Sequence, residues 1–334
     1  MRRLMVTVAA LVAAGTAAGP APADGLPVGG VEVGPSGVAG PAEPVRYVAL
    51  RAGAGTLVAR VEQDGGRVLG SRLLRGRFTV PAVALDGSPA GLSADGRTLV
   101  LIRPRDGFPQ RRTALAVLAT PRLRLRETVV LAGDFSFDAL SPDGSLLYLV
   151  EYVEPRDPTR YVVRGYDLER SRLLPEPVVD PRTFGDVMRG LPLTRAVSPD
   201  GRWAYTLYDG GGGTPFVHAL DTAEGTAACI ALDALAGRAD LLDVRLAVAG
   251  DGREVRVLAG TEAVAVIDAR TLRAHEPSLE ASPPAAARPE GDGSAPWALL
   301  GGVLALASAA IAGVAVALRR RRLPAAPGAR APGA

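Results

Sequence analysis

The chain has 334 residues, 48% of them hydrophobic and 22% charged, which is enough for one large domain or two ordinary ones. It contains no lysine and no asparagine, so all 38 of its Lys+Arg positions are arginine. These absences exclude a lysine Schiff base, a phosphate-loop lysine, a kinase lysine and N-linked glycosylation, each of which needs a side chain that the chain lacks.

The net charge of +3 is unevenly distributed along the chain. Seven of the arginines lie in the two ends, which leaves 31 arginines against all 35 acidic residues between residues 24 and 296, a net charge of −4. Nucleic-acid binding depends on a basic surface that neutralises phosphates. A mildly acidic body of mixed sign therefore predicts no nucleic-acid partner.

Residues 1–23 have the pattern of a secretory signal peptide. A pair of arginines precedes an apolar stretch that is too short to span a bilayer, and Ala21-Pro22-Ala23 offers a cleavage site of small residues. We expect ordinary secretion, since the residues that usually flank the paired arginines of the twin-arginine route are missing. Residues 24–42 then form an N-terminal segment, which contains a possible ring-closing strand at residues 30–34.

A Ser-Pro-Asp-Gly turn or a close variant recurs four times in the middle of the chain, each time followed by a run of β-forming residues. The turns lie at residues 93–96, 141–144, 198–201 and 249–252. Their glycines are 48, 57 and 51 residues apart, and repeats of this length with several short strands are typical of propeller blades. The glycine suits the positive φ of a tight turn, and the proline presets the angle before it.

A second recurring sequence pattern supports the same repeat. Apolar runs that end in aspartate follow three of the turns and predict third strands at residues 161–167, 216–221 and 264–268. Fourth strands are expected to begin at Arg172 and Thr226.

Upstream of the first turn, residues 46–50, residues 56–62 and a run from Arg72 predict the second, third and fourth strands of a unit whose first strand is missing. Residues 30–34 are the candidate for that strand. We therefore predict an all-β fold, a β-propeller of about five four-stranded blades over residues 43–275. Six shorter blades or an open arc are the alternatives.

The Ser-Pro-Asp-Gly turns and the apolar-aspartate turns resemble those of bacterial propellers of the WD40-like and Tyr-Val-Thr-Asn (YVTN) families. The resemblance covers only the body and concerns the fold, which binding scaffolds and enzymes share, so it carries over no catalytic residue. The Trp-Asp dipeptide of eukaryotic WD repeats is absent from the sequence, which argues against that subfamily.

Residues 276–296 are rich in proline, alanine and glycine and predict a disordered stalk that reaches on the order of 25 Å. Residues 297–318 are 22 residues without a charge, enough for one transmembrane helix. Four arginines begin the basic tail, residues 319–334, and predict a cytoplasmic C-terminus by the positive-inside rule. We expect a single-pass protein of the cell membrane with its body outside. Residues 191–195 resemble part of a sortase signal, but they lie within the body and are interpreted as chance.

Small residues recur every four positions within the predicted transmembrane helix. On a helix they form one ridge that lets a second helix approach closely, so a transmembrane helix partner or a homodimer is expected there. Alanine-rich composition is the alternative explanation. The ridge consists of Gly301, Ala305, Ala309, Gly313 and Ala317.

The connections after the second strands are long and irregular. Antiparallel order places them on one face, which we call the loop face, opposite the Ser-Pro-Asp-Gly turns on the turn face. Long loops on a rigid scaffold commonly carry binding sites, so we expect the loop face to bind a protein partner or an anionic small molecule. Solvated arginines without a partner are the alternative. The residues expected to line it are Arg105, Phe108, Arg111, Arg112, Arg156, Arg160, Arg182 and Phe184.

Nucleophilic and metal chemistry have few candidates. Of the two histidines, His218 alternates with apolar residues on a predicted strand and His275 lies beside the stalk, so a Ser or Cys triad is not expected. Cys229, the only cysteine, lies in an apolar run and is expected to be buried. The spacing of these residues and of the aspartates fits neither zinc nor calcium, and no metal or other cofactor is expected.

Acid–base hydrolysis by carboxylates near the channel is the enzymatic alternative, with Glu151, Asp157 and Asp209 as the first candidates. Carboxylates within about 6 Å of each other would favour it. The function we expect is a cell-surface, membrane-anchored propeller that acts as a non-catalytic binding or sensing module. The alternatives are an extracellular propeller hydrolase or lyase, and a structural subunit that assembles through the small-residue ridge.

Overall fold

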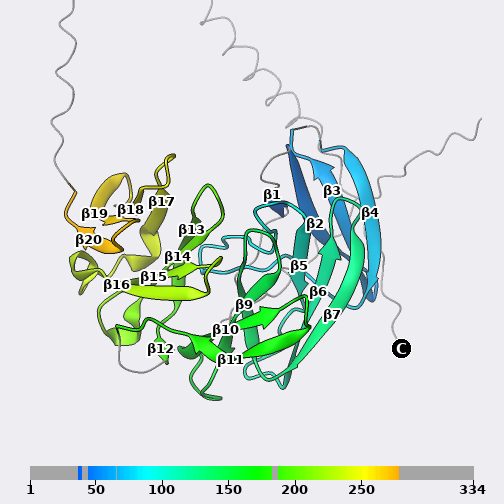
Figure 1. Ribbon diagram of the computed structural model, residues 1–334, viewed down its shortest axis with the longest axis horizontal. Coiled ribbons are helices and arrows are strands. Elements are labelled where there is room, and N and C mark those ends of the chain that lie inside the picture. Colours follow the sequence, from blue (N-terminus) through cyan, green and yellow to red (C-terminus); the bar gives the residue numbers. More distant parts are fainter. Residues whose placement is uncertain (1–36, 40–43, 65, 183–186, 278–334) are drawn as a thin grey trace, which may run out of the picture. The chain divides into compact units, whose positions relative to one another are not determined.

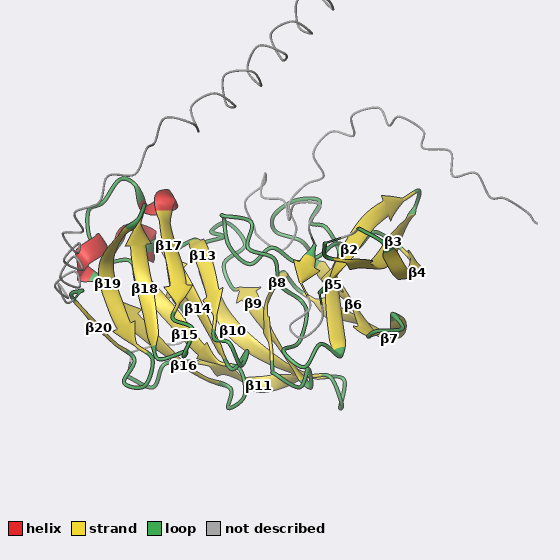
Figure 2. Ribbon diagram, turned by 90° about the horizontal axis from the view of Figure 1, so that it is seen from above, coloured by secondary structure: helices red, strands yellow, loops and turns green. Residues whose placement is uncertain are grey.

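The computed structural model describes residues 37–39, 44–64, 66–182 and 187–277, which form five antiparallel sheets. Sheet follows sheet along the chain, and in each one the neighbouring strands are consecutive in sequence (Figure 1). We number these sheets blades 1 to 5. Strands supply nearly all the regular structure of the described residues, and the short helical turns are red in Figure 2.

The strand bounds are as follows. Blade 1 contains β1 (Val38–Ala39), β2 (Val45–Ala52), β3 (Gly55–Glu62) and β4 (Val68–Arg75). Blade 2 contains β5 (Thr98–Ile102), β6 (Arg112–Ala119) and β7 (Arg124–Ala132). Blade 3 contains β8 (Phe135–Leu140), β9 (Leu146–Tyr152), β10 (Arg160–Asp167), β11 (Arg172–Val178) and the short β12 (Met188–Arg189), which pairs with β10.

The last two sheets each have four strands. Blade 4 contains β13 (Pro192–Val197), β14 (Trp203–Tyr208), β15 (Phe216–Asp221) and β16 (Thr226–Ala231). Blade 5 contains β17 (Val244–Val248), β18 (Glu254–Ala259), β19 (Glu262–Asp268) and β20 (Arg273–His275). The 3₁₀ turns are η1 (Gly210–Gly212), η2 (Asp233–Leu235) and η3 (Leu241–Asp243).

The first two blades depart from the predicted repeat on their inner side. In blade 1 the first position is taken by β1, with Val38 opposite Tyr47, and the segment 30–34 that was expected there lies outside the described residues. In blade 2 two isolated bridges, Thr79 to Ile102 and Leu92 to Leu99, replace a first strand. Two prolines in the intervening segment have no amide hydrogen to donate, which explains why a continuous strand does not form there.

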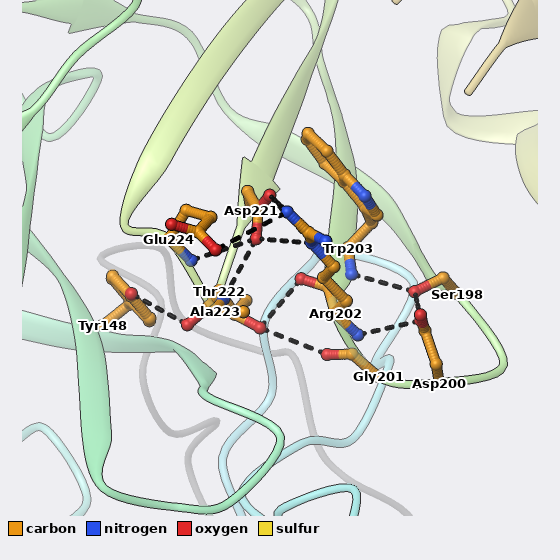
Figure 3. Close-up of polar contacts among 10 residues, drawn as sticks. All are labelled: Tyr148, Ser198, Asp200, Gly201, Arg202, Trp203, Asp221, Thr222, Ala223 and Glu224. Carbon is orange, nitrogen blue, oxygen red and sulfur yellow. Dashed lines mark hydrogen bonds and ion pairs between the residues drawn. The ribbon is translucent and has the colours of Figure 1, made fainter. Parts of the chain in front are cut away.

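Side-chain hydrogen bonds build each Ser-Pro-Asp-Gly turn. In blade 4 the Ser198 hydroxyl donates to Asp200 at 2.5 Å and accepts the Trp203 amide at 2.8 Å, while Gly201 has a φ of 72° (Figure 3). The turns of blades 2 and 3 repeat both contacts of the serine. The fourth turn has Ala249 in place of serine and so lacks them.

The aspartate that ends the third strand of blades 3, 4 and 5 organises the following turn. Asp221 accepts the backbone amides of Ala223 and Glu224, both at 3.1 Å, and the corresponding aspartates of blades 3 and 5 do the same. Arg202 donates to the Asp221 carboxylate from two nitrogens, so the two recurring motifs of blade 4 are tied together (Figure 3). The Tyr148 hydroxyl of blade 3 donates to the Thr222 carbonyl at 2.9 Å and joins the two blades.

Neighbouring blades pack through apolar clusters. Val58 and Leu99 belong to one cluster shared by blades 1 and 2, and blades 2 and 3 and blades 4 and 5 share others. Successive four-stranded antiparallel sheets that pack face to face are the arrangement of propeller blades. The prediction of an all-β, propeller-type body is therefore confirmed in the described residues.

The seam between blades 3 and 4 contains a polar row. Arg195, Thr206, His218 and Cys229 lie opposite one another on successive strands, so their side chains share one face of blade 4. The apolar clusters at this seam, which include Tyr148 and Tyr208 as well as small residues, are smaller than those at the other seams.

In the described part of the chain, no helix combines the length and hydropathy that crossing a membrane requires. The predicted transmembrane helix at residues 297–318, with its small-residue ridge, lies outside the described residues. The predicted signal peptide, stalk and tail lie outside them as well, apart from the first two residues of the stalk.

Candidate binding face

Hydrogen bonds tie the long connections of blades 2, 3 and 4 to the chain where it enters blade 3 or blade 4. The connection between β5 and β6 contacts the start of blade 3, where Asp134 accepts the Gln110 amide at 2.7 Å. The connection between β9 and β10 contacts the entry to blade 4, where the Gly190 amide donates to the Thr159 carbonyl at 2.9 Å. Asp209, after β14, accepts the Leu191 amide at 2.8 Å. The loop face predicted from the antiparallel order is thus present in these three blades.

Arg105 belongs to the interior of this face and not to its exposed rim. Its guanidinium forms an ion pair with Asp134 at 2.7 Å, and each of the two side chains is only 5% exposed. It also donates to the Phe135 carbonyl and the Ser136 hydroxyl, both at 3.2 Å. Burial raises the pKa of Asp134, against the opposing effects of Arg105 and the Gln110 amide. Arg105 therefore joins blade 2 to blade 3.

Phe108 covers this ion pair from the side of the loop. Its ring meets Tyr152 edge-on at 5.6 Å, and the Arg105 guanidinium lies 6.0 Å from its centroid. Arg160, the first residue of β10, is half-buried. Arg105 and Phe108 therefore shape the face, and Arg160 has no ion pair in the described structure.

Three of the predicted arginines remain available. Arg111, Arg112 and Arg156 are exposed, and no ion pair within the described ranges involves any of them. Arg111 ends the connection before β6, Arg112 is the first residue of β6, and Arg156 lies in the connection before β10. These three side chains are the exposed arginines without an ion pair among the residues predicted to line the loop face and described by the structure.

Arg182 is exposed but already paired. It donates to both carboxylate oxygens of Asp180, the shortest contact being 2.8 Å, and Asp180 also accepts the Cys229 amide of β16 at 2.7 Å. Although burial alone would raise the pKa of Asp180, these hydrogen bonds lower it to about 2. Arg182 is thus held beside the outer strand of blade 4. Phe184 lies outside the described residues.

The carboxylates considered for hydrolysis each have a local partner. Glu151 forms an ion pair with Arg164 at 2.7 Å. Asp157 accepts the amide and the hydroxyl of Thr159, and these bonds lower its pKa. Asp209 accepts the amides of Leu191 and Gly211. Asp157 and Asp209 therefore shape loops, whereas Glu151 joins two neighbouring strands of blade 3.

His218 is buried in blade 4, whereas Cys229, which was predicted to be buried, is only half-buried. Burial lowers the pKa of His218 to about 4, so its imidazole is neutral at pH 7, and its Nε2 has no hydrogen-bond partner in the described structure. Burial also raises the pKa of the Cys229 thiol to about 11, which keeps it protonated and poorly nucleophilic. The interpretation of His218 as a packed strand residue is confirmed, because its side chain is only 1% exposed.

An open cleft of about 760 Å³ lies on the turn face between blades 4 and 5, where the sequence predicted no binding. Trp203 and side chains of both charges line it, among them Arg253 and Asp268. Asp268 already accepts two backbone amides of its own turn. The mixed charge of this cleft favours no ligand of a particular sign.

The sequence analysis did not single out Asp134, Asp138 or Arg195. Each is a charged residue that lies within, or at the edge of, an innermost strand, where the neighbouring residues are mostly apolar. A charge in such a strand is the signal that could have identified them, because an innermost strand is the most buried part of a blade.

Comparison with known proteins identifies no family for the chain. No protein-family model matches it, and no curated protein matches it either. Among solved structures it is similar to hydrazine synthase of Kuenenia stuttgartiensis, with 18% identity over 76% of this chain and 80% of that chain and a TM-score of 0.40.

Two further structures are similar at the same level. TolB from Acinetobacter baumannii has 15% identity over 69% of this chain and 51% of its own, with a TM-score of 0.40. The Cps50 (Swd1) beta-propeller domain of Myceliophteria thermophila has 10% identity over 67% of this chain and 70% of its own, with a TM-score of 0.38. The chain spans about half the length of the TolB structure.

Proposed function

We propose that the chain is a non-catalytic binding module whose loop face docks a protein partner with an acidic surface. The observation that carries this proposal is that Arg111, Arg112 and Arg156 are exposed and form no ion pair in the described structure, on segments at the same end of blades 2 and 3. Complementary charge steers association and sets specificity. A protein partner fits better than a small anion, because the side chains come from two separate segments, Arg111 and Arg112 from blade 2 and Arg156 from blade 3.

The double variant Arg111→Glu/Arg112→Glu tests this proposal. The full chain, tagged and purified with its membranes, is used to capture and crosslink partners. We expect the variant to lose the partner that the unaltered chain captures, and 0.5 M salt to weaken capture, because screening shortens the reach of exposed charges. The melting temperature should stay nearly unchanged, since neither arginine has a folded-state ion pair to lose.

Arg97→Glu/Arg124→Glu is the matched control. These two arginines are also exposed and belong to the turn face, and their replacement by glutamate changes the net charge by the same amount. A partner that is lost equally from both double variants responds to net charge alone, and a partner retained by the Arg111→Glu/Arg112→Glu variant does not use the loop face. Either result would overturn the proposal.

We further propose that this module is displayed at the cell surface by the predicted transmembrane helix at residues 297–318. Support comes from the 22 uncharged residues, the four arginines that follow them and the secretory pattern at residues 1–23. Protease added to intact cells should remove the body and spare a tag at the C-terminus. If the body resists the protease in intact cells, the proposed surface display is wrong. Release of the chain into the medium would also contradict it.

A further inference from the structure

Blades 1 and 5 end the series, and each has a far face, which is the face turned away from the neighbouring blade. Blade 5 packs on blade 4 through Val255 and Val257. Its far face carries Arg245, Glu254 and Arg256, all of them exposed. A terminal repeat needs a polar outer face of this kind to stay soluble. The far face of blade 5 therefore needs no cover.

The far face of blade 1 is apolar instead. Blade 1 packs on blade 2 through Tyr47 and Val58, so the residues that alternate with these lie on the far face. There Leu50, Leu57 and Leu73 lie opposite one another on three successive strands. Leu50 is 48% exposed and Leu73 is 65% exposed. A group of exposed large apolar residues of this kind commonly marks a contact surface.

No other blade covers this far face. Val48, Ala59 and Val61, which share it with the leucines, are at most 8% exposed and form an apolar cluster without a member from another blade. Within the described ranges, no apolar cluster contains residues of both blade 1 and blade 5. The cover of the far face of blade 1 must therefore come from a segment outside the blades or from another molecule.

The chain enters blade 1 beside this far face. Gly37 has a φ of 68°, and a Cβ at its position would lie 2.9 Å from Val48 Cγ1. The backbone before β1 therefore contacts a residue of the far face. Residues 24–36, which we call the entry segment, precede this point and follow the predicted signal peptide; they lie outside the described residues. From Gly37 back to Val31 the chain can extend about 20 Å, whereas three strand spacings, about 14 Å, separate β1 from β4.

The entry segment complements the far face in apolar character and in charge. Val31 and Val33 alternate with Glu32, a pattern typical of a strand with one apolar side. The charged residues of the entry segment are both acidic, Asp24 and Glu32. The strands of blade 1 place the exposed Arg75 on the far face and no acidic residue. A symmetric contact between two copies of this face would instead bring arginines together, which disfavours a second copy.

We propose that the entry segment lies across the far face of blade 1, with its valines on the row of leucines, and caps the series of blades at this end. Because the segment belongs to the same chain, its effective concentration is high and a small contact suffices. Blade 1 and blade 5 are then two separately finished ends, one capped by the entry segment and the other by its own charged residues. The proposal concerns blade 1 alone, so it is independent of the binding proposed for the loop face.

Disulfide trapping in the full chain in detergent tests this proposal. Cys229, the only cysteine, is replaced by alanine, so that the introduced cysteines are the only thiols. Val31→Cys is combined with Leu73→Cys or, as the matched control, with Arg72→Cys. Leu73 and Arg72 are exposed neighbours on β4 whose side chains lie on opposite faces of blade 1.

Under oxidation by copper phenanthroline, we expect the Leu73→Cys combination to form its disulfide on the order of 10-fold faster than the Arg72→Cys combination, because the entry segment is held at the far face. Equal rates for the two combinations would overturn the proposal. Leu73→Cys alone, without Val31→Cys, should stay monomeric on a non-reducing gel. A disulfide-linked dimer of this single variant would overturn the proposal in favour of a second copy.

Maleimide labelling provides a second measurement that does not depend on disulfide geometry. Val31→Asp/Val33→Asp makes the apolar side of the entry segment charged and leaves every residue of the blades unaltered. It should speed the labelling of Leu73→Cys on the order of 10-fold, by releasing the cover, and leave the labelling of Arg72→Cys unchanged. Circular dichroism verifies that the blades are folded. An unchanged labelling rate at Leu73→Cys in the folded variant would refute the proposal.

Discussion

Two buried arginine–aspartate pairs join blade 3 to its two neighbours, and they differ in what surrounds them. Asp134 and Asp138 lie four residues apart at the innermost strand of blade 3; Arg105 reaches the first from blade 2, and Arg195 reaches the second from blade 4. All four side chains are at least nine-tenths buried. The chemistry of the two pairs is thus the same, and only their surroundings set their roles.

The Arg105 pair is enclosed by protein. Asp134 also accepts the Gln110 amide, and the Arg105 guanidinium lies 5.2 Å from the centre of the Tyr152 ring, which covers nitrogens that make no hydrogen bond. The Arg195 pair instead borders a cavity of about 220 Å³. The comparison teaches that two buried ion pairs of the same chemistry can join blades in different surroundings, one enclosed by protein groups and the other beside a cavity.

Removing each arginine gives the largest expected effect and tests this difference directly. Arg105→Ala leaves Asp134 as an uncompensated charge inside protein and should lower the free energy of unfolding by about 3–5 kcal/mol. Arg195→Ala should cost less, about 1–3 kcal/mol, because water in the cavity can hydrate Asp138. Urea unfolding followed by circular dichroism measures both. Equal losses would show that the cavity does not distinguish the pairs.

The polar row behind Arg195 predicts a dependence of stability on pH. Because burial lowers the pKa of His218 to about 4, the unfolded chain binds a proton near pH 6.5 that the folded chain does not bind until pH 4. The free energy of unfolding should therefore fall by about 3 kcal/mol as the pH falls from 6.5 to 4. His218→Leu should remove this component, whereas His275→Gln, at an exposed position, should retain it. Identical profiles for the unaltered chain and His218→Leu would contradict the prediction.

The smallest effect concerns the aromatic cover of the Arg105 pair. The Tyr152 hydroxyl and the Ser136 hydroxyl form a hydrogen bond of 2.9 Å. Tyr152→Phe removes that bond but keeps the ring over Arg105, and should lower the free energy of unfolding by about 1 kcal/mol. Tyr152→Leu also removes the ring and should cost more, by about 0.5–2 kcal/mol. If both variants are equally stable in urea, the ring does not stabilise Arg105.

The repeat was readable in the sequence because its causes are local. Ser198 contacts residues only two and five positions away, and Asp221 contacts residues two and three positions away. The same residue types recur at the same spacing in the other blades, so turns and third strands were correctly predicted. The first strand of blade 2 was not correctly predicted. Isolated bridges take its place, and the spacing of residues in the sequence does not specify which residues form them.

The arrangement of the candidate binding residues was predicted only in part. Arg111, Arg112 and Arg156 are exposed as expected. Arg105 was expected on the same surface, but Asp134, which is distant in the sequence, draws it into the seam between two blades. Arg195 was mentioned only as part of a chance match to a sorting signal at residues 191–195, and the match gave no indication that Arg195 forms a buried ion pair with Asp138.

Composition and residue order were thus sufficient to establish that the body is a series of antiparallel sheets, because hydrogen bonds within a few residues specify each turn. Only the tertiary structure decided which arginine lies in solvent, which one joins two blades and which one borders a cavity. Asp138 and Arg195 are 57 residues apart, and their separation in the sequence carries no information about burial. Burial converts the same pair of side chains from a weak surface contact into a structural joint.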